Sequence, residues 1–259
     1  MKTPFKTPPA LAMLLIGMLA LAGAAQAGSD GSPHNRSAHT ALGAAARAAH
    51  FDSTTRSESS RHQWRGKSNA EWVQAHLRWM LSIPLNVNPL VDTAGVNCGI
   101  NQDGPVWFVS FAPLPTYTLT CTIPYGKAIV APTIAAFNNY PCPTDPANPN
   151  APPFEPAAGQ TLEDFLAAGL FDVVGTLNAD ATLNGRPLKA RRVTTPVFGF
   201  TAAGSLNAID ACITGSPQLS VSDGYFVFID PLPRGDHVLQ ITSSGPGFAS
   251  VGTINLKVR

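Results

Sequence analysis

The sequence predicts a mainly β protein, an antiparallel β-sandwich or jelly-roll-like domain with one or two packed helices. Three observations lead to this fold class. The chain has 259 residues, of which 44% are hydrophobic and 13% are charged, so it can bury a core but offers few groups for ion-pair networks. Its second half alternates apolar and polar residues over short segments. Between those segments stand turn residues drawn from 22 glycines and 24 prolines.

Charge argues against two classes of partner. Lysine and arginine total 17, against 16 aspartates and glutamates. A nearly neutral chain has no strong positive field to hold a phosphate backbone or an anionic membrane. We therefore expect no nucleic-acid partner.

The first 27 residues have the pattern of a signal peptide. Lys2 and Lys6 precede an apolar run, and Ala25-Gln26-Ala27 is a small-x-small cleavage site. We expect cleavage between Ala27 and Gly28, which makes the mature protein secreted or periplasmic. No later segment approaches the roughly 20 apolar residues that a membrane-spanning helix requires, so we expect no transmembrane segment in the mature chain.

Residues 28–66 are predicted to be a disordered, low-complexity lead-in or pro-segment. They are mostly Ser, Ala, His, Arg and Gly, with too few large apolar residues to offset the entropy of ordering them. Four of the six histidines fall here, and their irregular spacing favours a solvated linker over metal capture. Residues 67–259 are then expected to form a single β-sandwich-like domain.

One helix opens this domain. Ser68 and Glu71 form a capping box, and Pro84 ends the helix. Its apolar face carries Trp72 and Trp79 at helical spacing. Two tryptophans on one stripe indicate packing on a sheet, and a ligand-stacking platform is the alternative. A second, short helix is expected from Leu162 to about Leu170, capped by Thr161.

The remaining segments have the pattern of strands. We expect the first three, at 106–111, 117–123 and 128–134, to be adjacent in one sheet. Seven prolines in residues 141–156 predict a long flap or crossing loop. Asn184-Gly185 is a strong hairpin turn. Later strands are expected, with antiparallel pairing, at 179–183, 193–200, 225–229, 238–242 and 251–258.

Four cysteines in an exported chain imply two disulfides, for which three connectivities are possible. We favour Cys98–Cys121, which ties the loop after the helix to the second strand, and Cys142–Cys212, which pins the flap to the C-terminal sheet. No C-x-x-C pair occurs, and the predicted domain holds only two histidines. A metal site built on cysteine and histidine is therefore not expected.

Several segments together resemble a family of exported bacterial proteins of unknown function. They are Ser82-Ile83-Pro84, Gly104-Pro105-Val106-Trp107-Phe108, Cys121-Thr122-Ile123-Pro124 followed by Gly126-Lys127, and Pro231-Leu232-Pro233 followed by Gly235 and His237. Their order is that of the family, and the likeness covers most of residues 70–242. The resemblance implies one domain and carries no reaction, cofactor or partner.

No motif of the common hydrolases or nucleotide-binding proteins is present. Carboxylates near strand or loop ends could form a pair for glycoside cleavage, and Lys127 could act as a base or pair with Asp103. The alternatives are turn-capping aspartates and a solvated turn lysine. Asn97, Asn101 and Gln102 with the same acids could hold calcium. The candidate catalytic residues are Asp92, Asp103, Lys127 and Asp223, with Asp172 and Asp230 as further acids.

Two functions follow from these candidates. The first is a non-catalytic exported β-sandwich that binds a glycan, a peptide or a cell-envelope component through loops at one end of its sheets. Rings for such a ligand are offered by Trp107, Tyr117 and Tyr125. The second is an extracellular polysaccharide hydrolase or lyase that uses carboxylates and Lys127.

Overall fold

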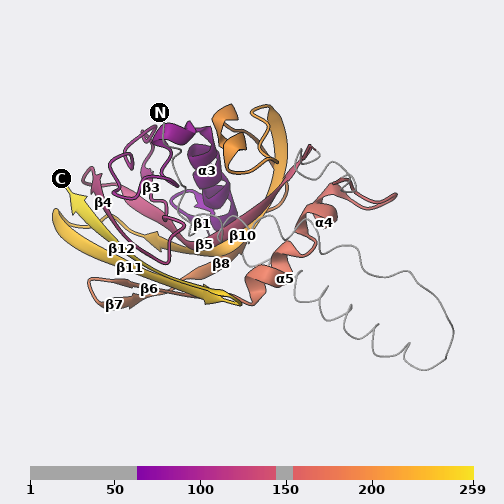
Figure 1. The fold of residues 1–259 in the computed structure, drawn as a ribbon. Coiled ribbons are helices and arrows are strands. Elements are labelled where there is room, and N and C mark those ends of the chain that lie inside the picture. The colour runs from indigo at the N-terminus through magenta and orange to yellow at the C-terminus, as the bar shows by residue number, and fades with distance from the viewer. Residues whose placement is uncertain (1–62, 144–153) are drawn as a thin grey trace, which may run out of the picture.

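The computed structural model describes residues 63–143 and 154–259. The expected signal peptide, its cleavage site and residues 28–62 lie outside this part of the chain. The described residues form a mainly β protein of three layers, in which a helix covers one sheet and a second sheet covers the other face of the first (Figure 1). No helix in the described ranges is long and apolar enough to cross a bilayer.

The first sheet is built around two long strands. Its order is β3-β5-β10-β8, and β9 also pairs with β10. β3 runs parallel to β5, and the other pairs are antiparallel. The ladder between β5 and β10 shifts by one residue at Thr133, whose hydroxyl donates to the Tyr225 carbonyl at 3.0 Å. The strands are β3 (Val106–Phe108), β5 (Ala128–Tyr140), β8 (Arg191–Thr194), β9 (Phe198–Thr201) and β10 (Pro217–Ile229).

The second sheet has the order β4-β12-β11-β6-β7. β4 lies parallel to β12, and the other neighbours are antiparallel. The first three strands were expected to be adjacent in one sheet. This is wrong for the second of them, β4, which lies in the other sheet from β3 and β5. The turn at Pro124-Tyr125-Gly126 carries the chain from one sheet to the other, with Gly126 at φ 88°. The strands are β4 (Thr116–Ile123), β6 (Asn178–Leu183), β7 (Arg186–Leu188), β11 (Gly235–Gly245) and β12 (Phe248–Val258).

The core between the sheets follows from period-two alternation along the strands. In β4, Tyr117, Leu119, Cys121 and Ile123 are buried while the threonines between them face outward. The other sheet faces them with Ile129, Ala131, Val227 and Ile229. The prediction of a sandwich-like β fold is confirmed.

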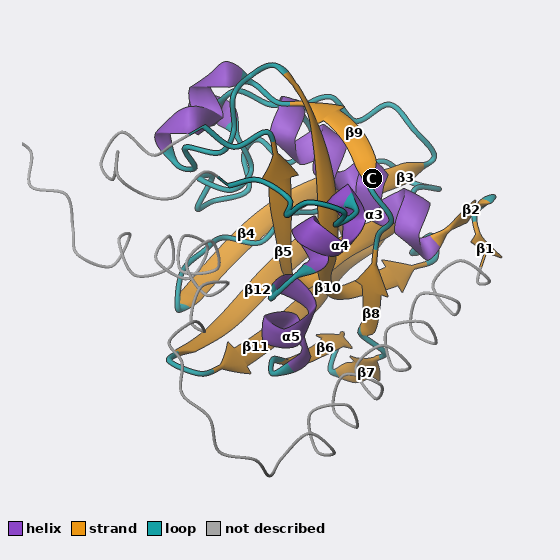
Figure 2. Ribbon diagram, turned by 90° about the vertical axis from the view of Figure 1, so that its right-hand side faces the viewer, coloured by secondary structure: helices purple, strands orange, loops and turns teal. Residues whose placement is uncertain are grey.

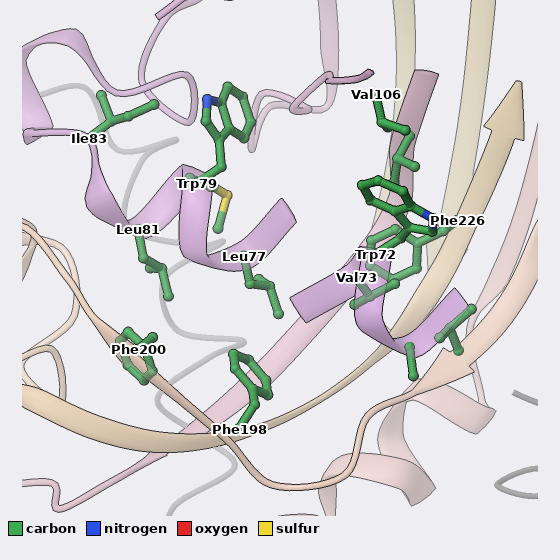
Figure 3. Close-up of a cluster of buried hydrophobic side chains, with 14 of the residues drawn as sticks. Trp72, Val73, Leu77, Trp79, Leu81, Ile83, Val106, Phe198, Phe200 and Phe226 are labelled. Atoms are coloured by element: carbon green, nitrogen blue, oxygen red, sulfur yellow. The ribbon is translucent and has the colours of Figure 1, made fainter. Parts of the chain in front are cut away.

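Helix α3 (Asn69–Ser82) covers the opposite face of the first sheet. Ser68 accepts from the Glu71 amide and Glu71 accepts from the Ser68 amide, so the predicted capping box is present. Trp72 and Trp79 belong to the buried apolar cluster under this helix (Figure 3). Their Nε1 atoms donate to the carbonyls of Trp64 and Ile100. The tryptophans are core residues, and the alternative of a ligand-stacking platform is wrong.

Two short helices stand where one was expected. α4 (Leu162–Ala167) ends early, and Gly169, at φ 73°, starts α5 (Leu170–Gly175). Thr161 accepts from the Asp164 amide as predicted. Both helices pack on the outer halves of β5 and β10 through a third apolar cluster around Leu166, Leu170 and Val221 (Figure 2).

The expected strand at 193–200 is two strands, because Pro196 cannot donate to the ladder. Thr195, between the two strands, stays bonded to β10, because its amide donates to the Ser222 carbonyl and its hydroxyl accepts from the Ser222 amide. β10 begins at Pro217, eight residues before the expected strand.

The ordered domain also begins earlier than expected. β1 (Gln63–Trp64) pairs with β2 (Lys67–Ser68), so the predicted disordered segment extends at least four residues too far. The ring of Trp64 packs on Trp72 and Phe228, which supplies the apolar contact that orders this turn. Both favoured disulfides, Cys98–Cys121 and Cys142–Cys212, are present.

Candidate functional site

Lys127 and Asp103, proposed as a base and its acid, do not pair through their charges. The Lys127 ammonium donates to the backbone carbonyls of Gly104 at 2.5 Å and Asp103 at 3.3 Å. The Asp103 side chain is exposed. Lys127 therefore ties the turn before β5 to the loop before β3, rather than extending into solvent as the turn-residue alternative assumed.

Asp92 caps a loop. Its carboxylate accepts from the amides of Ala94 at 3.2 Å, Gly95 at 2.9 Å and Asn97 at 2.6 Å. Three amide donors leave little of the carboxylate for a substrate. Gly95 is required beside it, because a Cβ there would stand 2.6 Å from the Thr120 carbonyl oxygen.

Asp223 is fully buried on β10 and forms an ion pair with Arg192 of β8. The guanidinium donates to Oδ2 at 2.5 Å and 3.1 Å, and it also donates to the Phe171 carbonyl of α5. Burial lowers the pKa of Arg192, but the hydrogen bond and charge of Asp223 outweigh burial and leave that pKa raised. The pair thus joins β8, β10 and α5, and we assign it to structure.

Two of the proposed calcium ligands, Gln102 and Asp230, are hydrogen-bonded within the protein. The Gln102 amide nitrogen donates to the carbonyls of Cys98 and Phe108, and its oxygen accepts from the Phe108 amide. Asp230, which follows β10, bonds Trp64 and Arg65. Within the described ranges, no three His, Cys, Asp or Glu side chains are grouped to hold a metal ion.

Two of the three proposed ligand-binding rings are core residues. Trp107 and Tyr117 are each 6% exposed, and both lie between the sheets. Burial raises the pKa of Tyr117 to about 12. Their prediction as binding residues is wrong. The alternation of side chains along a strand separates its two faces, but it does not tell which face is covered by the other sheet. Tyr125, by contrast, is 57% exposed.

Tyr125 lies at the end of the sheets where several connections meet. The Arg234 guanidinium lies 4.8 Å from the centre of its ring. The Tyr125 amide donates to the Arg259 carbonyl at 2.6 Å, and the Arg259 side chain forms an ion pair with Asp236. We call Tyr125, Arg234, Asp236 and Arg259 the loop-end cluster.

Sequence reasoning missed both arginines of the loop-end cluster. Arg234 occupies the Pro-x-Gly turn before β11, and Arg259 follows β12, so their nearness to Tyr125 depends on long-range pairing. The adjoining His237 has a fixed orientation. Its Nδ1 lies 3.0 Å from Asn184 Nδ2 and its Nε2 lies 2.9 Å from the Pro233 carbonyl oxygen, so Nδ1 accepts and Nε2 donates.

A groove of about 580 Å³ lies at the far end of the first sheet, over β9 and β10. The exposed side chain of Leu219 forms part of its wall. The amide of Gln218 in this wall donates to the carbonyls of Pro141 and Cys212, and its oxygen accepts from the Thr214 amide. A ligand site needs a few convergent polar groups that are free to orient the ligand. The groove therefore supports binding less well than the loop-end cluster.

No protein-family profile matches the chain, and no curated protein sequence matches it significantly. Among solved structures, a match is found to PbICP-C in complex with falcipain-2. It covers 59% of this chain and 98% of the other at 8% sequence identity, with a TM-score of 0.24. A likeness at that score carries no inference about fold or function.

Proposed function

We propose that this chain is an exported, non-catalytic protein that binds a glycan through the loop-end cluster. The observation that carries the proposal is the pairing of Tyr125 with Arg234. Tyr125 offers an exposed ring at the end of the sheets, and Arg234 stacks on one side of it. An aromatic face and a planar guanidinium are the groups with which proteins bind the apolar face and the hydroxyl or carboxylate groups of a sugar.

The lack of an ion-pair partner for Arg234 among the described residues supports the same ligand. Arg65 and Arg259 each form an ion pair with an aspartate, but no carboxylate of the described residues is within ion-pair distance of Arg234. Its N–H donors are therefore available to hydroxyls or to a carboxylate on the ligand. Loops at one end of a β-sandwich are also a common place for recognition.

Export is supported by the leader pattern and by the two disulfides. Disulfides persist in oxidising compartments, and this domain closes its loops with two of them. The cleavage of the leader remains a prediction. It is tested by the mass of the protein recovered from the periplasm or medium, which should begin at Gly28.

The hydrolase or lyase alternative has less support. It requires Lys127 or a pair of carboxylates to converge on a cleft. Instead Lys127 and Asp92 are occupied by backbone groups, and Asp223 is buried against Arg192. The atom with which a general base accepts a proton must lie within hydrogen-bond reach of the substrate.

The test is a glycan array and a polysaccharide panel, both probed with the mature protein. We expect binding to at least one glycan. Replacing Tyr125→Ala or Arg234→Ala should weaken it about tenfold, the size of effect for a stacked, desolvated ring or guanidinium. Arg186→Ala is the matched control, because Arg186 is an exposed arginine on β7.

Three results would contradict the proposal. They are binding that survives both loop-end variants, retention of peptides only, and release of new reducing ends or unsaturated products from a polysaccharide. The last result would establish the hydrolase or lyase alternative.

A further inference from the structure

The charged residues of this domain are divided unevenly between the two ends of its sheets. The chain as a whole is nearly neutral, but residues 128–185 contain no lysine and no arginine. The described part of this stretch carries acids before and on α4, on α5 and on β6: Glu155, Glu163, Asp164, Asp172 and Asp180. A nearly neutral chain can still have a strong local field, because the field depends on where the charges lie.

The loop-end cluster lies at the other end of the sheets. Figure 1 shows the end of β12 on its left side and both α4 and α5 on its right side. The turn 124–127, the start of β11 and the end of β12 meet at the left end. Cations outnumber acids in these three segments, which carry Lys127, Arg234, Lys257 and Arg259 against Asp236.

Two of the cations at this end have no carboxylate partner. The acids here each stand beside a cation: Asp236 with Arg259, Asp230 with Arg65, and Asp103 with Lys127, which bonds its backbone. Arg234 and Lys257 are exposed, and no carboxylate of the described residues is within ion-pair distance of either. Their charges are therefore available to a ligand.

The strand register places Lys257 beside the loop-end cluster. Its register partner on β11 is Asp236, and its partner on β4 is Thr122. Neighbouring strands lie about 4.8 Å apart, so the Lys257 side chain is one strand spacing from the cluster. Arg234 comes one residue before β11, with its guanidinium 4.8 Å from the centre of the Tyr125 ring. One exposed ring and two unpaired cations thus meet where β4, β11 and β12 end or begin.

We propose that the loop-end cluster, together with Lys257, selects acidic glycans whose sugars carry carboxylates, as uronic acids do. This inference rests on the glycan binding proposed above and names the class of glycan. A guanidinium matches a carboxylate with two parallel N–H donors, and an ammonium adds a point charge. A uronic acid carries its carboxylate on the same sugar ring whose apolar face packs on an aromatic side chain. Tyr125 and Arg234 can therefore contact a single sugar residue.

The acids around α4, α5 and β6 act in the same direction. They repel an acidic polymer from their own end of the domain, while the loop end attracts it, so the polymer is steered to one site. Both effects are electrostatic and weaken with salt, because the Debye length falls from about 10 Å at 0.1 M to about 3 Å at 1 M. Binding of a neutral glycan would show no such salt dependence.

The test compares acidic polysaccharides with uncharged forms of the same polymers. Polygalacturonate, alginate and hyaluronan are each probed before and after their carboxylates are reduced to primary alcohols, which keeps the sugar rings and their linkages. We expect the mature protein to bind at least one acidic polymer about tenfold more tightly than its reduced form. About 1 M salt should remove most of that preference.

Three charge variants locate the preference. Lys257→Gln should weaken binding to the acidic polymer about threefold, because it removes one unpaired cation. Asp236→Asn removes the carboxylate of the loop-end cluster and should strengthen that binding, a gain that misfolding cannot produce. Arg186→Gln is the matched control and should leave binding unchanged, because it removes one exposed cation from β7, two strands away from β11. Circular dichroism must show that every variant is folded.

Four outcomes would contradict the preference for carboxylates. Reduced polymers bound as tightly as acidic ones would overturn it and leave glycan binding in place. Dextran sulfate bound as tightly as the best uronic acid polymer would show that any polyanion suffices. Equal binding by Lys257→Gln and Arg186→Gln would mean that Lys257 does not contact the ligand's charge. Binding to no glycan at all would overturn both this inference and the function on which it rests.

Discussion

The ring of Tyr117 lies against the backbone of Gly252, its register partner on the parallel strand β12. A Cβ at position 252 would stand 2.1 Å from Tyr117 Cζ. Only glycine leaves room for this ring inside the sandwich, and the ring in turn accounts for the burial of Gly252.

Gly252→Ala is therefore expected to lower the free energy of unfolding by about 1–3 kcal/mol through overpacking. Urea unfolding measures the loss. Gly99→Ala is the control, because its Cβ would meet Trp107 at 3.7 Å, an ordinary contact. Tyr117→Val removes the ring that a Cβ at position 252 would meet. The double variant should therefore lose less stability than the sum of the two single variants, and a loss equal to that sum would count against the contact.

Stability should fall as the pH is lowered through the titration range of His76. This side chain is 1% exposed beside Phe108 and Phe226, and burial lowers its pKa from 6.5 to about 4. Below pH 6.5 the unfolded chain takes up a proton that the folded chain refuses, so stability is lost between about pH 6.5 and 4. The loss reaches up to about 3 kcal/mol.

Urea unfolding from pH 7 to pH 4 checks this slope. His76→Gln removes the titrating group and should flatten the slope, whereas His237→Gln, at a partly exposed position, should leave it in place. An equal slope in the wild type and His76→Gln would show that other groups cause the acid sensitivity.

Asp223→Asn is expected to destabilise the domain by about 3–5 kcal/mol, because it leaves the Arg192 charge in a largely buried site without its partner. Asp236→Asn is the control. It breaks the exposed ion pair with Arg259, which is expected to cost at most about 1 kcal/mol. Thermal unfolding ranks the two variants. Comparable decreases in melting temperature would contradict the structural role of Asp223.

Lys127→Met should leave glycan binding unchanged and lower stability by about 1 kcal/mol, because the ammonium no longer bonds the carbonyls of Asp103 and Gly104. Lys189→Met, at an exposed position on the loop before β8, should change neither quantity. Loss of function in a fully folded Lys127→Met protein would overturn the non-catalytic proposal.

Features with a local signal could be predicted from the sequence. The capping box of Ser68 and Glu71 begins α3 as expected. Asn184 and Gly185 adopt the positive φ angles, 50° and 76°, that a tight hairpin requires. Each of these depends on residues within a few positions of one another.

Features set by distant residues could not be predicted. The assignment of β4 to the second sheet depends on β12, more than a hundred residues later in the chain. For the same reason Trp107 and Tyr117 were misplaced, since burial depends on which surface the opposite sheet covers. Tyr125 is exposed because it stands in a turn rather than on a strand face, and its role in binding stays a prediction.

The parallel pairing of β4 with β12 also constrains the order in which the molecule can assemble. β12 joins β4 to the rest of the second sheet, so this sheet cannot be completed before β12 has been synthesised. Such a high contact order slows folding. An unfolded chain can pass through a narrow translocation channel and a folded domain cannot, so late completion of the second sheet is compatible with the export proposed above.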